Sequence, residues 1–189
     1  MNRKKILFSA FSLFYTLLGV AQTSSLSENE NVVSVSMDPE LSITTNTSIS
    51  KKHSTLMAAI KMADLEEVLS SDGPFTVFAP SNVAFDNLSE FNIVNFLKPE
   101  NKKQVYSLLT HHIVAGNFSA SSILKKMCRG NGTTSFTTVL GDKLIATMHG
   151  TDIILSDAFG NTAKIIHADA NQCNGVIHEI DSVFVLKKI

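Results

Sequence analysis

Apolar positions in the first half of the chain recur with the period of an α-helix. Over residues 54–70 they fall three or four positions apart, on one helix face, and Asp64 interrupts the pattern. This spacing predicts two short helices. Further helices are predicted after Pro80, after Pro99 and over residues 119–127.

Residues 75–79 alternate and are β-prone, which predicts a strand. After Gly132, short β-prone runs separated by turn-forming pairs dominate the chain. From Val176 to Val183 apolar residues occupy both alternating sets, which indicates a strand that is buried on one face and partly covered on the other. A helical first half that leads into a meandering β-rich half predicts an α+β domain, or a β-sandwich with helices at one end. The β-prone runs are residues 75–79, 113–116, 133–140, 143–148, 152–155, 163–168 and 176–186.

The first residues have the pattern of an export signal. Three basic residues precede an apolar run over residues 6–20. Residues 19–21 then place small side chains where a signal peptidase recognises them, so cleavage is predicted after Ala21. The run is 15 residues long, shorter than the ~20 that a spanning helix needs. We therefore predict a signal peptide at residues 1–21, with an uncleaved N-terminal anchor as the alternative. No later stretch is expected to span a membrane, so the protein is predicted to be secreted, periplasmic or on the cell surface.

The chain after the signal segment divides into two parts. Residues 22–50 are rich in Ser, Thr and Asn and lack a sustained apolar period, which predicts a flexible spacer. Residues 51–189 are predicted to form one domain, since the 168 residues left after cleavage suffice for one sizeable core. The oligomeric state does not follow from the sequence.

Charge excludes one class of partner. Loss of the three basic residues of the signal segment changes the formal net charge from −1 to −4. A mildly acidic protein neutralises phosphates poorly, so nucleic acid is not an expected partner.

Two cysteines remain, Cys128 and Cys173, and an exported protein meets conditions in which disulfides persist. Both lie beside predicted turns, so a bridge between them is predicted, closing a loop of about 45 residues. Two buried free thiols are the alternative.

Four blocks of sequence resemble the fasciclin domain family, in the order in which that family carries them. Together they cover roughly residues 51–186, a whole domain. The first is a strand–Pro–cap–helix segment and the last a C-terminal strand. They are Phe75–Phe85, Leu109–Gly116, Thr138–Leu144 and Asn174–Phe184.

The resemblance implies a wedge of two packed β-sheets with several helices around it. It also implies an extracellular adhesion or interaction module, related to periostin-type and bacterial members, that binds protein, matrix or glycan without catalysis. The residues that carry the family signature are Phe75, Phe78, Ala79, Pro80, Asn82, Phe85, Asn174, Gly175, His178 and Asp181.

Two further positions are carried over as candidate partner-binding residues. In animal matrix members an Asp-Ile pair shortly before the Asn-Gly signature has been proposed for integrin contact; here Asp169 takes that place and Ala170 follows it. A Tyr-His pair is also discussed for adhesion; here His111 replaces the Tyr, and His112 matches.

Six histidines raise the question of a metal. Adjacent His111 and His112 would point about 100° apart on a helix and could not easily share an ion. No recognised metal-ligand spacing, nucleophile elbow or nucleotide-binding loop occurs in the sequence, so no catalytic residue, metal or cofactor is predicted. The alternative function is a small-ligand or metal-binding exported domain that uses His167, Asp169 and His178.

Overall fold

The computed structural model describes residues 36–71, 73–88 and 93–186. The predicted signal peptide and residues 22–35 of the predicted spacer lie outside the described residues. Everything described belongs to one compact unit that spans residues 33–189. Within that part of the chain, no helix has the length and apolar character needed to cross a membrane.

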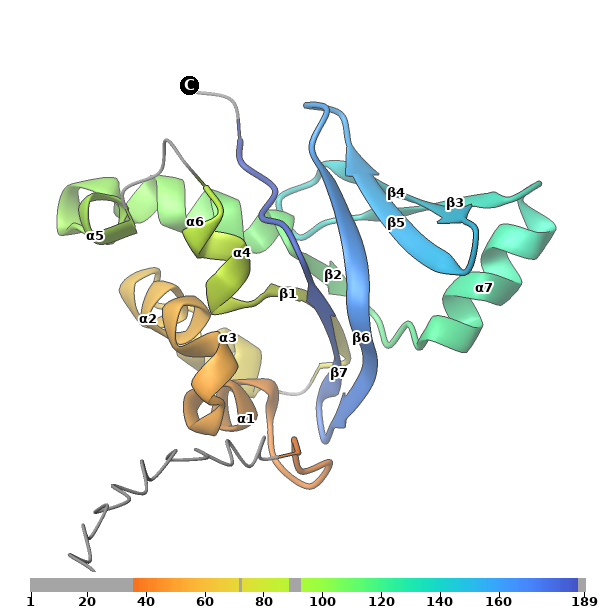
Figure 1. Ribbon diagram of the computed structural model, residues 1–189. Helices are drawn as coiled ribbons and strands as arrows, with labels where there is room; N and C mark the ends of the chain where they lie inside the picture. Colours follow the sequence, from red (N-terminus) through yellow and green to blue (C-terminus); the bar gives the residue numbers. More distant parts are fainter. Residues whose placement is uncertain (1–35, 72, 89–92, 187–189) are drawn as a thin grey trace, which may run out of the picture. The chain divides into compact units, whose positions relative to one another are not determined.

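The helical spacing of the first half of the chain produces a group of short helices beside the sheet (Figure 1). α2 and α3 confirm the two helices predicted over residues 54–70, and Asp64, at φ 56°, lies between them. Ser81 is the N-cap of α4: its side chain accepts a hydrogen bond from the main-chain N–H of Ala84. The helices are α1 (Ile43–Ile49), η1 (Lys51–His53), α2 (Ser54–Met62), α3 (Glu66–Ser70), α4 (Asn82–Asp86), α5 (Ile93–Phe96), η2 (Pro99–Asn101), α6 (Lys102–His111) and α7 (Ala120–Arg129).

Every predicted β-prone run contains a strand. The strands are β1 (Phe75–Pro80), β2 (Ile113–Ala115), β3 (Thr133–Thr137), β4 (Lys143–His149), β5 (Asp152–Asp157), β6 (Thr162–Gln172) and β7 (Gly175–Ile180). Only β7 ends well before its prediction, which ran to Leu186. Beyond Ile180 the chain stays beside the sheet, but the main-chain N–H of Phe184 donates to the His112 side chain and not to a neighbouring strand.

The strands form one seven-stranded sheet in the order β2-β1-β7-β6-β5-β4-β3. β1 and β7 pair in parallel, and the other neighbours are antiparallel. The two edge strands, β2 and β3, approach each other. Val114 of β2 forms a bridge with Thr138, which follows β3, and Val139 N donates to Ile113 O at 2.7 Å. The α+β class is thus confirmed, whereas two packed sheets are not: the sheet bends until its edges nearly meet.

The long strand β6 makes this bend. Its first residues pair with β5 up to Lys164, and from Ile165 onward it pairs with β7 alone. Two register shifts interrupt the β6–β7 ladder. Irregularities of this kind increase the local twist and turn the strand, which lets one strand belong to both halves of the sheet.

β1 and β7 separate two cores. Val77, Ala79 and Ile177 point toward the helices and belong to a helical-side core, while Phe78 and Ile180 point into a β-side core. Alternation along the strand assigns neighbouring residues to opposite faces. The helical-side core draws on α1 to α4 and α6; the β-side core is closed by α7, through Ile123 and Met127. In Figure 1, α1 to α6 lie on one side of β1 and β7, and α7 lies beyond β3.

The last part of the predicted spacer is folded. α1 lies inside residues 22–50, and its Ile43 belongs to the helical-side core. Asn46, buried in the same helix, donates to Asp38 O and to the Gln172 side chain. The sequence did not reveal this helix, because Thr, Asn and Ser make up most of it and leave no sustained apolar period.

Candidate functional site

The predicted contact residue Asp169 lies at a break in the β6–β7 ladder. The register shifts between Ile165 and His167 and again between His167 and Ala170. Asp169 has φ 61°, a conformation uncommon outside glycine. Residues 166–169, which we call the β6 bulge, are all exposed. β6 therefore presents a short kinked segment to solvent.

Asp169 is held in place on two sides. Its Oδ1 accepts a hydrogen bond from Ala120 N at 2.7 Å, at the start of α7. Its own N–H donates to His178 Nδ1 at 3.1 Å. Because that nitrogen accepts, the ring hydrogen is on Nε2, which donates to Phe118 O at 2.7 Å. The β6 bulge, β7 and the segment before α7 are thus joined through one imidazole.

The His178 imidazole is kept neutral by its surroundings. The residue is fully buried, and its ring stacks on Phe78 with centroids 5.8 Å apart. Burial lowers the pKa of His178, while its hydrogen bond to Phe118 O and the charge of Asp169 oppose that effect. A neutral ring can both accept and donate, which its two hydrogen bonds require.

Thr76 holds the segment before α7, which contains Gly116 and Phe118, through its side chain. Its hydroxyl donates to Gly116 O at 2.6 Å and accepts from Phe118 N at 2.9 Å. Gly116 has φ 110°, and a Cβ there would lie 2.9 Å from the Phe118 ring. This role was not predicted from the sequence, because a threonine within a strand is an ordinary β-former.

His112, the second candidate contact residue, is buried and does not reach the surface. Its Nε2 accepts from Phe184 N at 3.1 Å, so its Nδ1 carries the hydrogen and donates to Leu108 O at 2.8 Å. Burial is the largest cause that lowers the pKa of His112 to about 4. His112 therefore joins α6 to the segment after β7, and the folded structure does not bring it together with Asp169 on one face.

His111 points away from His112, with ring planes at 85° and centroids 6.4 Å apart. Its Nε2 lies 3.2 Å from Asp157 Oδ2 and its Nδ1 lies 3.3 Å from Asp142 Oδ2. Asp157 also accepts from the main chain of Phe159 and from Asn161. The position that carries Tyr in adhesion members thus holds an imidazole between two carboxylates here, joining α6 to the β4 and β5 ends.

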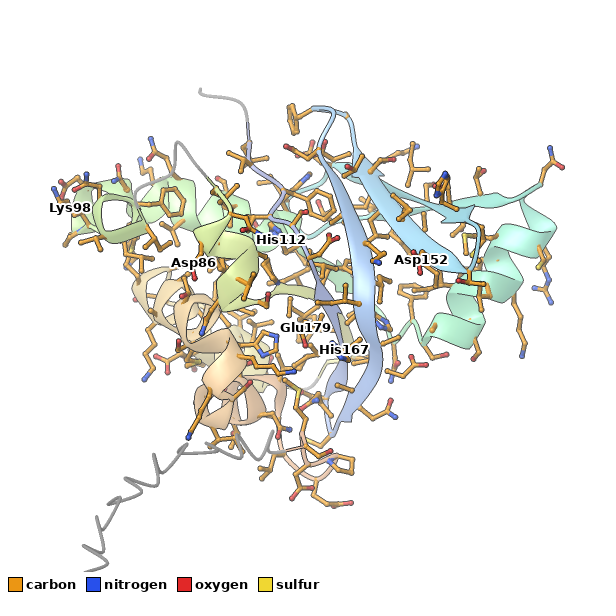
Figure 2. All side chains as sticks on the ribbon, in the orientation of Figure 1. Asp86, Lys98, His112, Asp152, His167 and Glu179 are labelled. Atoms are coloured by element: carbon orange, nitrogen blue, oxygen red, sulfur yellow. The ribbon has the colours of Figure 1, made fainter. Side chains whose placement is uncertain are left out.

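A second group of titratable side chains lies on the face of β7 that is turned toward the helices, where Glu179 is opposite Ala79. His167 Nδ1 lies 3.2 Å from Glu179 Oε2, and Figure 2 shows the two side by side. His53 is buried nearby; burial lowers its pKa and the charge of Glu179 opposes that. Its Nδ1 is hydrogen-bonded to Ser50 Oγ at 2.9 Å.

The three residues of the alternative metal site are engaged elsewhere. His178 uses both ring nitrogens on protein partners, and Asp169 Oδ1 receives Ala120 N. His167 points to Glu179. Across the part of the chain that the structure describes, three or more His, Cys, Asp or Glu side chains do not gather as metal ligands. The arrangement supports positioning of the β6 bulge better than metal binding.

The Asn-Gly signature forms a junction between the sheet and the helices. Asn174 Oδ1 accepts from Ile43 N at 3.0 Å, and Nδ2 donates to Leu69 O at 2.7 Å and to Ser71 O at 3.1 Å. At Gly175 a Cβ would meet Phe75 O at 2.0 Å, so only glycine fits where β7 passes β1.

The remaining signature residues have structural positions. Asn82 accepts from Thr55 N at 3.0 Å and donates to Lys51 O at 2.9 Å, which fastens α4 to the start of α2. Asp181 accepts from Lys164 N at 2.8 Å and closes the end of β7. The other signature residues form β1 or pack beside it: Phe75, Phe78, Ala79, Pro80 and Phe85.

The predicted disulfide is wrong. Cys128 and Cys173 are both free, and both are exposed, which also differs from the alternative of buried thiols. Cys128 is in the last turn of α7, whereas Cys173 follows β6, where its N–H donates to Leu41 O at 3.0 Å. A bridge requires Cα atoms within ~7 Å. The prediction relied on each cysteine lying beside a turn, but the fold does not bring those two turns together.

Comparison with known proteins gives one consistent likeness. The sequence profile of the Fasciclin domain matches residues 51–186. A protein of the cyanobacterium Synechocystis sp. is 32% identical over 177 residues, which cover 94% of this chain and 91% of that protein. Transforming growth factor-beta-induced protein ig-h3 of Sus scrofa is 31% identical over 137 residues, 70% of this chain and 17% of that protein.

A solved structure has a similar fold. It is a domain pair of the insect cell adhesion molecule Fasciclin I, with a TM-score of 0.69 and 14% identity. The similarity covers 78% of this chain and 52% of that one, so the chain spans about half of the pair.

Proposed function

The chain belongs to the fasciclin domain family, and from that premise we propose that it is an exported, non-catalytic module that binds a partner at a cell surface or in the surrounding matrix. The observation that supports this most is the extent of the family match, which takes in residues 51–186 and hence both cores. The similarity to a domain pair of an insect cell adhesion molecule supports the same proposal.

The surface that we propose for contact is the β6 bulge. It is exposed, and it includes the apolar side chain of Ile166, which is 38% exposed. Asp169 uses Oδ1 for Ala120 N, and its Oδ2 makes no hydrogen bond within the described part of the chain, so that oxygen can accept one from a partner. Because Asp169 and His178 fix the bulge, little conformational entropy is lost on binding.

His112 acts indirectly in this proposal. Its hydrogen bonds to Leu108 O and Phe184 N hold the end of α6 against the segment that follows β7. His112 would therefore stabilise the fold and would not touch the partner. Export follows from the predicted signal peptide at residues 1–21, and the protein would then be secreted, periplasmic or surface-attached.

The proposal is tested by adding the fluorescently labelled exported chain to cells and to immobilised extracellular matrix. We expect saturable retention. Ile166→Lys combined with Asp169→Ala should weaken retention at least tenfold, whereas Val83→Lys, an exposed position on α4, should leave it unchanged. Absence of retention on every surface at high protein concentration would refute the proposed function. Equal loss in both variants would refute the β6 bulge as the contact surface.

A further inference from the structure

Acidic residues are missing from a long stretch in the middle of the chain. Residues 101–141 contain five Lys or Arg residues and no Asp or Glu, although the whole chain has 17 acidic residues. Three of the five basic residues, Lys125, Lys126 and Arg129, lie on α7. An excess of one charge on one element of an otherwise mildly acidic domain marks a surface that attracts the opposite charge.

The fold turns these three residues to solvent on a rigid support. Ile123 and Met127 are buried in the β-side core, and Ser119 caps the helix by accepting from Ser122 N at 3.3 Å. Residues 124–126, between Ile123 and Met127, and residues 128–129, after Met127, are exposed. Lys125 and Arg129 are four residues apart and so lie on one helix face. We call Lys125, Lys126 and Arg129 the α7 basic face.

The α7 basic face has no carboxylate partner among the described residues. Elsewhere, Lys102 pairs with Asp64 and Lys164 pairs with Asp152. Lys126 instead lies over the Phe118 ring, 5.2 Å from its centroid, which orients the charge without neutralising it. Asp169 contacts the helix at its other end, at Ala120.

The surroundings of the α7 basic face favour one kind of anion. A membrane-bound helix needs an apolar face to insert, but the apolar residues Ile123 and Met127 are committed to the core. A tight interface with a folded protein usually has buried aromatic or aliphatic residues at its centre, and Leu124 alone offers that here, at 38% exposed. A flexible chain of repeated negative charges needs only cations and hydroxyl groups. Ser121 on α7 and Thr133 at the start of β3 are exposed residues that carry hydroxyl groups.

We propose that the α7 basic face binds an acidic polysaccharide, one with carboxylate or sulfate groups along its chain. This inference rests on the proposed binding function and names one class of partner for it. The contact is electrostatic, so it weakens with salt. Figure 2 shows nitrogen-tipped side chains that project from α7 away from the sheet, where a long polymer can reach them.

The test uses the exported chain and immobilised dextran sulfate, with neutral dextran as the reference polymer. The variant Lys125→Gln/Lys126→Gln/Arg129→Gln removes the charges. A matched variant, Lys51→Gln/Lys52→Gln/Lys61→Gln, removes the same number of exposed charges from η1 and α2. A double variant, Lys125→Gln/Arg129→Gln, keeps the contact between Lys126 and Phe118 in case its loss disturbs the helix.

We expect the native chain to bind dextran sulfate and not neutral dextran. The triple variant on α7 should bind at least tenfold more weakly, and the slope of log affinity against log salt should fall by about one for each cation removed. The double variant should show an intermediate loss, and the matched variant should change affinity by less than about twofold. This pattern would support the proposal.

Other outcomes would overturn it. Failure of the native chain to bind dextran sulfate at low salt would do so, as would an equal loss in the matched variant, because net charge would then be the cause. Binding to phosphatidylserine vesicles but not to dextran sulfate would assign the face to lipid. If the chain is retained on cells or matrix and fails only with dextran sulfate, the proposed function stands and this inference falls. If it is retained nowhere, the proposed function falls.

Discussion

The two cores on either side of β1 and β7 are fastened by different polar side chains. On the helical side the buried connections are made by amides, which have the same charge at every pH. On the β side they are made by imidazoles, which lose their hydrogen-bond pattern when they are protonated. The amides are Asn46, Gln172 and Asn174, and the imidazoles are His112 and His178.

The difference shows that two equally buried polar side chains can differ in their sensitivity to pH. Asn174 and His178 lie four residues apart on the same turn and strand, and both connect the sheet to segments distant in sequence. Only the histidine can take up a proton as the pH falls, and burial lowers the pKa at which it does so. His53 is the exception on the helical side, since burial lowers its pKa as well. The β-side core should therefore respond more strongly to acid.

The largest expected effect compares neighbouring residues of β1 that face opposite cores. Phe78→Ala should lower the free energy of unfolding by about 3–5 kcal/mol, because it empties a site in the β-side core where Phe136 and His178 contact the ring. Val77→Ala, on the helical side, removes less apolar volume and should cost about 2 kcal/mol. Urea unfolding at neutral pH measures both. A cost for Val77→Ala that equals or exceeds the cost for Phe78→Ala would contradict the comparison.

The next effect is the response of the native protein to acid. The pKa of His112 falls from 6.5 to about 4 on folding, so the unfolded state binds the proton more readily. Stability should thus fall as the pH drops from about 6.5 towards 4 and then level off, a loss on the order of 3 kcal/mol for this group. His178 and His53, whose pKa values are also lowered, act in the same direction.

Urea unfolding at a series of pH values tests this expectation, and proton NMR titration of the imidazoles assigns it to residues. His112→Asn should flatten the pH dependence even if it lowers stability at neutral pH, because no proton is then taken up at that site. Stability that stays constant from pH 7 to pH 4.5 would show that the imidazoles do not set the response of the β-side core.

A smaller effect, independent of pH, is expected on the helical side. Asn174→Ala removes the partners of Ile43 N, Leu69 O and Ser71 O and should cost about 1–3 kcal/mol. The loss should be the same at pH 7 and pH 5, because an amide does not titrate. Asn161→Ala, at a less buried amide beside β5, serves as the comparison. A loss at Asn174 that grows in acid would break the distinction between the two cores.

The smallest effect concerns the two thiols, one beside each core. Cys128→Ser and Cys173→Ser should each change the free energy of unfolding by less than about 0.5 kcal/mol, because both side chains are exposed and unbridged. Both should react with Ellman's reagent in the folded, unreduced protein. If the native protein had no reactive thiols and its mass were two hydrogens lower than that of the reduced protein, the cysteines would be bridged.

The sequence carried most of the local structure. Helical spacing over residues 54–70 predicted α2 and α3, alternation predicted β1, and β-prone runs between turn-forming pairs predicted the strands after Gly132. The helix α1 escaped notice, since Asn46 and its neighbours contact the domain through hydrogen bonds that leave no apolar period. Of the site, Asp169 was identified only through the family's pattern, and Thr76 was missed because its role depends on Gly116 and Phe118, forty or more residues away.

By itself, the sequence determined which residues alternate between faces, where turns interrupt them, and which family the four ordered blocks indicate; these properties depend on residues close together along the chain. Only the tertiary structure decided that β6 bends the sheet until its edges nearly meet, that Cys128 and Cys173 stay apart, and that His112 is buried while Asp169 is exposed. Those outcomes depend on which distant segments pack together, and packing is settled by the sum of many weak contacts that no local pattern contains.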